Sequence, residues 1–211
     1  MDFSIFKKHI QLLSNTEIGG LEAQFRLAPE IRKQFSEEKI KANNPKKAAV
    51  LVIFYPNHKG ELNFLLTLRA SYKGVHSAQI SFPGGKLDRK DVSLKNTALR
   101  EAREEVGVIE KDIAVFKEMT NVYIPPSNFI VTPYLSYLNY TPNFSKNYEV
   151  AALIEVKLSD LLCDSVISST ILSTSYAKNI NVPCFKLNNY IVWGATAMML
   201  NEIKELIKTI S

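Results

Sequence analysis

A glutamate-rich run, Leu99–Val108, constrains the fold most, because its pattern is compatible with one local structure. Its apolar positions recur at the spacing of an amphipathic helix, and Gly107 stands where a helix C-terminus favours glycine. The sequence therefore predicts a helix over residues 93–106. At about 100° per residue, the apolar residues fall on one arc of this helix, and three carboxylates share another. These are Glu101, Glu104 and Glu105.

This acidic arc supports two interpretations. On a solvated helix face, Arg100 and Arg103 would partly neutralise the acids, and the like-charge pair Glu101 and Glu105 would cost about 0.2 to 0.5 kcal/mol. The other interpretation is a divalent-cation site, because Mg²⁺ and Mn²⁺ prefer hard oxygen ligands and complete their shell with water and phosphate.

The turn before the helix favours the cation. Pro83-Gly84-Gly85 is a tight turn that exposes its backbone, so it can offer peptide carbonyls to a cation and leave room for a phosphate. Three cationic side chains, Arg69, Lys73 and Lys86, lie near this turn in the sequence.

The rest of the chain alternates strand-like and helix-like patterns. Residues 1–45 have helical and connecting character and are expected to be a helical extension, followed by one domain over residues 46–211. A closing amphipathic helix is expected over 195–210. Strands are expected at 48–55, 62–69, 113–124, 130–138, 150–157 and 182–187, the first two as a hairpin. This pattern predicts an α/β fold with a mixed sheet covered by helices on both sides.

Composition excludes several classes of protein. The chain has 211 residues and a formal charge of +5. Residues 1–47 carry nine Lys and Arg against six Asp and Glu, so most of this charge lies there and the rest of the chain is nearly neutral. Nucleic-acid binding is therefore not expected. Cys163 and Cys184 are expected to be buried free thiols rather than zinc ligands. No signal peptide and no run of roughly 20 apolar residues is present, so no membrane partner and a cytoplasmic location are expected.

The acidic helix and its preceding turn resemble the Nudix box, written G-x5-E-x7-R-E-U-x-E-E-x-G-U with U a bulky apolar residue. Gly85 opens the match, Asp91 replaces the first glutamate, and Arg100–Val108 supplies the second half with Ala102 as its first U. One extra residue lies before Arg100. The resemblance implies the Nudix fold, an α/β/α sandwich with a mixed central sheet.

The segment before the box resembles one branch of that family, the coenzyme A pyrophosphatases. Leu65–Ala70 reads L-L-T-x-R-A and residues 82–85 read F-P-G-G, and members of the branch carry the same Asp and the same longer spacer. Gly74 and Ala78 stand where the branch has Arg and Gly, and these two departures concern the substrate. Further similarity lies in residues 124–127, 129–133, 149–151 and 192–197.

The resemblance implies a metal-dependent site. Mg²⁺ or Mn²⁺ would be held on the bridging phosphates by the Gly85 carbonyl region together with Glu101, Glu104 and Glu105. A carboxylate would accept the proton of the attacking water. Glu104 and Glu149 are both candidates for this base, and Glu149 could instead be an extra metal ligand.

Other residues of the motif are expected to position the site or the substrate. Arg100 should pair with Asp91 and brace the loop against the helix, which Gly107 ends. The side chains expected to contact substrate are Arg69, His76 and Lys86, each of which could instead have a merely structural or solvated role.

The function expected from this resemblance is hydrolysis of the diphosphate of coenzyme A or a derivative, giving 3′,5′-ADP and 4′-phosphopantetheine or its acyl form. The same machinery acting on ADP-ribose or NADH is the nearest alternative, and a non-catalytic ligand-binding regulator is an alternative of another class. The expected partner is a small, coenzyme A-like dinucleotide, and the apolar N-terminal residues would suit a homodimer.

Overall fold

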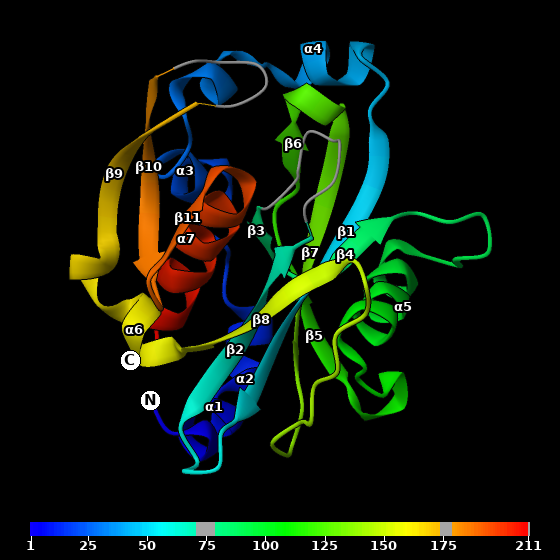
Figure 1. Cartoon of the computed structure of the whole chain (residues 1–211), viewed down its shortest axis with the longest axis vertical. Helices are drawn as coiled ribbons and strands as arrows, with labels where there is room; N and C mark the ends of the chain where they lie inside the picture. Colours follow the sequence, from blue (N-terminus) through cyan, green and yellow to red (C-terminus); the bar gives the residue numbers. More distant parts are fainter. Residues whose placement is uncertain (71–78, 174–178, 211) are drawn as a thin grey trace.

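The computed structural model describes residues 1–70, 79–173 and 179–210, and its centre is a mixed sheet (Figure 1). β1 (Lys46–Pro56) and β7 (Phe129–Tyr137) run parallel in the middle of this sheet. The other strands of the sheet in the described chain pair antiparallel. They are β2 (Leu62–Arg69), β3 (Ile80–Ser81), β4 (Gly84–Lys86), β5 (Ala114–Glu118), β6 (Val122–Ile124) and β8 (Val150–Lys157). The expected β1–β2 hairpin is confirmed.

Strand β1 is buried on both faces, so its side chains alternate between two cores. The odd-numbered residues from 49 to 55 pack beneath α5 (Leu94–Val106). Val52 and Phe54 belong to the opposite core, beneath α7 (Gly194–Lys208) and the N-terminal helices. In Figure 1, α5 lies on one side of the sheet, and α7 and α3 lie on the other. The expected α/β/α sandwich with a mixed central sheet is therefore confirmed.

The first 45 residues are helical, as their pattern indicates. They form α1 (Phe3–Lys8), α2 (Ile10–Asn15), α3 (Gly20–Phe25), the 3-10 helix η1 (Glu30–Gln34) and α4 (Glu37–Ala42). The ring of Phe6 packs 5.0 Å from that of Phe54 on β1. Hydrogen bonds from Gly20 N and Gln24 Nε2 to Glu202 tie α3 to α7. The division of the chain at residue 45 stays a prediction.

The ends of α5 lie within one residue of the predicted ones. Ser93 caps its N-terminus, where the side chain accepts a hydrogen bond from Asn96 N at 3.2 Å. Gly107 adopts a left-handed φ of 74° directly after the helix, which explains why the run stops at glycine. Asn188 and Asn189, also with positive φ, make the turn between β10 (Ile180–Leu187) and β11 (Tyr190–Trp193).

Three details differ from the sequence predictions. The single strand expected over 113–124 is two strands, β5 and β6, because Pro133 on their partner β7 has no N–H to continue the ladder. Strand β9 (Ile167–Leu172) was not expected, and it pairs with β10 in a separate small sheet. Both cysteines were expected to be buried, but only Cys184 is; Cys163 is exposed.

In the described residues, no helix is long and apolar enough to cross a membrane. Short helices complete the chain: α6 (Leu158–Leu162), η2 (Glu110–Asp112), η3 (Pro125–Ser127) and η4 (Asp164–Val166).

Candidate functional site

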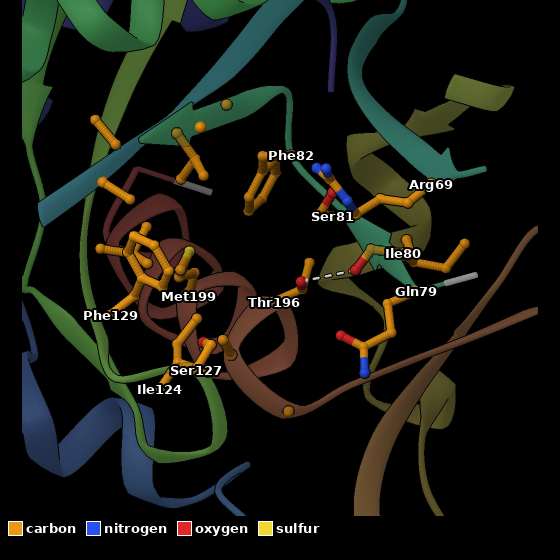
Figure 2. Close-up of a pocket in the computed structure, with 18 of the residues that line it drawn as sticks. Arg69, Gln79, Ile80, Ser81, Phe82, Ile124, Ser127, Phe129, Thr196 and Met199 are labelled. Carbon is orange, nitrogen blue, oxygen red and sulfur yellow. Dashed lines mark hydrogen bonds between the residues drawn. The ribbon is translucent and has the colours of Figure 1, made fainter. Parts of the chain in front are cut away.

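A cavity of about 640 Å³ lies between β4, the end of β2, the β6–β7 connection and the start of α7. Figure 2 shows Phe82, Phe129 and Met199 on one side of it, and the polar side chains of Arg69, Ser81 and Gln79 on the other. Thr196 at the start of α7 donates a hydrogen bond to the carbonyl of Ile80 at 2.8 Å, which fixes α7 against β3. The volume of this cavity is in the range of cavities that hold a small molecule.

The backbone of β4 approaches α5 and β1 so closely that its two glycines have no room for a side chain. A Cβ on Gly85 would lie 2.5 Å from the Glu101 carboxylate, and a Cβ on Gly84 would overlap β1. The N–H of Gly84 donates to Glu105 Oε2 at 2.9 Å. The tight turn expected at Gly84–Gly85 is wrong, because these residues pair with β1 as strand β4. This strand brings backbone and carboxylates together, with both glycines lining the cavity.

The three carboxylates of the acidic arc lie at graded depth. The exposed fraction of the side chain is 3% for Glu105, 16% for Glu101 and 46% for Glu104. Burial raises the pKa of Glu105 to about 7, even though Gly84 N and Arg69 favour its charged form, and the charges of Glu101 and Glu149 raise it further. Burial also raises the pKa of Glu101, against the opposing effect of Arg100.

Arginines neutralise these carboxylates. Arg100 Nη1 lies 2.9 Å from Glu101 Oε1 and 3.2 Å from Glu104 Oε2, and Arg69 Nη1 lies 3.5 Å from Glu105 Oε1. Among the residues that the structure describes, no three acidic, histidine or cysteine side chains are grouped as a ready metal-binding set. Each of the three acids instead has an arginine nitrogen within 3.5 Å.

The residues nevertheless fit a divalent cation. Glu101 and Glu105 are hard oxygen donors with raised pKa values, and a cation beside them would stabilise their charged form. The space that a Gly85 side chain would fill lies directly against the Glu101 carboxylate. A small ion could be reached there by the Gly85 backbone and by a carboxylate from α5.

The expected brace between loop and helix is present. Arg100 Nε and Nη2 each lie 2.9 Å from the Asp91 carboxylate, and Arg100 Nη2 also donates to the Lys86 carbonyl at 3.2 Å. Thr97 donates to Asp91 as well. The Arg100 guanidinium accordingly holds the pKa of Asp91 well below its usual value. Asp91 and Arg100 thereby fix the β4–α5 loop to the acidic helix.

Four further residues were expected to contact metal or substrate. Glu149 is exposed at the cavity lining, and its carbonyl accepts a hydrogen bond from Ala70 N at 2.8 Å. Arg69 lines the same cavity, and its buried Nε has no hydrogen-bond partner in the described chain. Lys86 Nζ is 5.8 Å from the centroid of the Phe129 ring. His76 lies outside the described residues, as do Lys73, Gly74 and Ala78.

Several lining residues carried no sequence signal. Arg32 reaches the cavity from η1, and Tyr148 and Met199 reach it from the loop before β8 and from α7. Tyr148 and Glu149 are neighbours in the sequence, so a search around the expected acid would have found the tyrosine. For Arg32 no local pattern exists, because its place depends on how η1 packs.

The chain is similar to proteins of one known family. The NUDIX domain family model matches residues 45–164. A protein from Photorhabdus laumondii, named as an uncharacterized Nudix hydrolase NudL, is 31% identical over 169 residues, covering 79% of this chain and 88% of that protein. The protein of the same name from Yersinia pestis, strain Pestoides F, is 32% identical over 161 residues, covering 76% and 79%.

Solved structures agree on the fold. The Nudix hydrolase RenU from M. smegmatis superposes with a TM-score of 0.56 at 18% identity, covering 79% of this chain and 88% of that one. At this identity the likeness concerns the fold alone.

Proposed function

The chain belongs to the Nudix family and is a pyrophosphohydrolase, and on that premise we propose that it cleaves the diphosphate of coenzyme A or a derivative. The products would be 3′,5′-ADP and 4′-phosphopantetheine or its acyl form.

One observation carries this proposal: the two signature segments of the coenzyme A branch form one wall of the cavity. Arg69 at the end of β2 donates its N–H to the carbonyl of Gln79 at 3.0 Å, just before the F-P-G-G segment begins. Arg69, Phe82, Gly84 and Gly85 all line the cavity. Residues from both segments that resemble the branch therefore line one wall of the space that a substrate would occupy.

Nudix hydrolases generally use divalent metals, and the proposed holders of Mg²⁺ or Mn²⁺ here are the Gly85 backbone, Glu101, Glu104 and Glu105. When bound, the cation supplies charge that neutralises phosphate oxygens and lowers the pKa of water. Arg69, with a buried N–H directed at no protein acceptor in the described chain, is proposed to bind the diphosphate. Lys86 and His76 are proposed as further substrate contacts.

Glu149 is the proposed general base. Both oxygens of Glu104 are engaged by arginines, Arg100 and Arg103, each at 3.2 Å. Glu149 is exposed at the cavity, and the backbone bond from Ala70 holds its position. A carboxylate placed in this way can accept the proton of the attacking water. Glu101 and Glu104 remain candidates for catalysis beside it.

The test is product identification by mass spectrometry on a panel of coenzyme A, acyl-coenzyme A, ADP-ribose and NADH, with Mg²⁺ or Mn²⁺. We expect kcat/KM for coenzyme A or its acyl form to exceed that of the other compounds by about tenfold or more. ADP-ribose or NADH turned over as fast as coenzyme A would overturn the substrate assignment, although not the family. Activity in excess chelator would overturn the metal site.

A further inference from the structure

The cavity is built from two parts of the chain. Its Gly84–Gly85 end belongs to residues 45–164, which match the Nudix domain. The second end includes residues outside that match, on η1, at the end of β11 and on α7. Its lining residues are Arg32, Trp193, Gly194, Ala195, Thr196 and Met199.

Arg32 is the cationic side chain of that second end. Its Nη1 donates to the Tyr123 carbonyl at 2.9 Å in a partly buried position, next to Ile124 of the lining. Its Nη2 lies 3.7 Å from the point where a Cβ on Gly194 would stand. The guanidinium is thus fixed between β6 and the first residue of α7, within reach of the cavity.

Apolar side chains separate the two ends. Figure 2 shows Phe82 toward one end, Met199 in the middle and Ile124 toward the other. Arg69 and Lys86 are the cations on the Gly84–Gly85 side, so the cavity offers positive charge in two places with an apolar wall between them. A ligand that matches this arrangement has two anionic groups joined by a flat or apolar body.

We propose that Arg32 binds a phosphate monoester of the substrate that is remote from the scissile diphosphate. The inference rests on the proposed function, because the 3′,5′-ADP half of coenzyme A carries such a group, the 3′-phosphate. The adenine ring would lie against the apolar wall between the two ends. A guanidinium suits this task, since its planar set of donors matches phosphate oxygens bidentately. ADP-ribose and NADH lack this phosphate, so Arg32 would discriminate against them.

The first test compares coenzyme A with dephospho-coenzyme A, which differ by the 3′-phosphate alone. We expect wild type to favour coenzyme A in kcat/KM by about tenfold or more, the effect of a hydrogen-bonded charge pair. Arg32→Gln should bring that ratio close to one. Lys33→Gln is the matched control, because Lys33 lies on the same 3-10 helix, pairs with Glu30 at 2.6 Å and does not line the cavity. Its ratio should equal that of wild type.

A second test needs no turnover. Calorimetry on the metal-free protein compares 3′,5′-ADP with AMP, which again differ by the 3′-phosphate, in wild type and both variants. We expect tighter binding of 3′,5′-ADP in wild type and in Lys33→Gln, with the difference lost in Arg32→Gln. Thermal melts check that the variants fold. If Arg32→Gln does not fold, Arg32→Lys replaces it. Lysine lacks the two parallel N–H donors of the guanidinium, so we expect a clear reduction in the preference for coenzyme A over dephospho-coenzyme A and in the preference for 3′,5′-ADP over AMP.

The outcomes separate this inference from the proposed function. An Arg32 variant that folds and keeps both preferences overturns the role of Arg32, while coenzyme A remains the substrate. Wild type that turns over ADP-ribose as fast as coenzyme A overturns the proposed function. In that case an Arg32-dependent preference for 3′,5′-ADP over AMP still supports a phosphate site at this end of the cavity, and its absence overturns both.

Discussion

The two ends of the cavity are built in different ways. At the Gly84–Gly85 end, backbone and carboxylates come from one short stretch, and Gly84 N contacts a glutamate 21 positions along the chain. At the Arg32 end, the contacts join η1 to β6 across 91 positions. The first end is a local motif with polar contacts, and the second is a product of tertiary packing. The proposed catalytic end and the proposed recognition end thus rest on different kinds of information in the sequence.

The two ends also differ in what holds them. The first depends on ion pairs around Arg100, which hold the β4–α5 loop. The second depends on how α7 docks, and α7 is held by buried polar contacts: Glu202 accepts hydrogen bonds from Thr120 at 2.5 Å and from Gln24 at 3.0 Å. Substitutions at the first end should therefore affect catalysis most, and those at the second should affect recognition and stability.

The largest effect is expected for Glu105→Gln. The amide oxygen can still accept the bond from Gly84 N, so the fold should survive, but the charge offered to a cation is lost. Because metal catalysis is worth several kcal/mol, we expect kcat to fall about 10³-fold or more, measured by product release. The control is Glu110→Gln, which removes a carboxylate beyond the end of α5 that pairs with Arg103. Near-normal turnover by Glu105→Gln would contradict the metal site.

Asp91→Asn should produce the largest change in stability. The Asp91 side chain is 5% exposed and the pair with Arg100 has two short contacts, so its loss leaves a guanidinium partly uncompensated. We expect the free energy of unfolding at pH 7 to fall by about 3 kcal/mol, measured by urea denaturation. Turnover should fall too, because Arg100 positions Glu101 and the loop.

The Asp91 effect has a defined pH dependence. Arg100 lowers the pKa of Asp91 from its ordinary 3.8, so this stabilisation is fully present above the unfolded value and is lost as the pH falls below it. The stability gap between wild type and Asp91→Asn should stay constant from about pH 8 to 5 and narrow below about pH 4. Asp160→Asn, at an exposed acid of α6, is the control. A gap that does not depend on pH would show that the charge of Asp91 is not what stabilises the fold.

The sequence allowed the Gly84–Gly85 end to be predicted because the residues that form it lie close together in the sequence. Spacing along one helix puts Glu101 and Glu105 on one face, and Gly107 and Ser93 set the helix ends, so the local pattern determines the geometry. The pairing of Asp91 with Arg100 was expected from the resemblance and is present. The roles of these residues in catalysis stay predictions.

Other features depend on contacts that no local pattern records. Arg32 reaches the cavity because η1 packs beside Tyr123. The break between β5 and β6 is caused by Pro133 on a different strand. Cys163 was expected to be buried as a small apolar side chain, but it follows α6 at the surface. For Arg32 and for the β5–β6 break the partner is distant in the sequence, so apolar pattern alone could not place them.

Gly85→Ala should affect turnover more than stability. The φ of Gly85 is not positive, so alanine strains no backbone there, but its Cβ would displace the flexible Glu101 carboxylate. Since misplacement of a reacting group by about 1 Å can cost 10²-fold, we expect kcat to fall between about tenfold and a hundredfold. The melting temperature should change little. Unchanged turnover would show that the position of Glu101 is not critical.

Gly194→Ala is the counterpart at the Arg32 end, and the smallest effect is expected there. Gly194 has a φ of 65°, so alanine strains the backbone by about 1 kcal/mol, whereas its Cβ would meet Arg32 at an ordinary contact distance of 3.7 Å. We expect the melting temperature to fall by about 2 to 4 °C with kcat almost unchanged, the reverse of the Gly85 pattern. Calorimetric melts and initial rates on the two alanine variants measure both effects side by side. If Gly194→Ala lowered kcat as much as Gly85→Ala, the start of α7 would contribute to the reaction itself, and the separation between a catalytic end and a recognition end would be wrong.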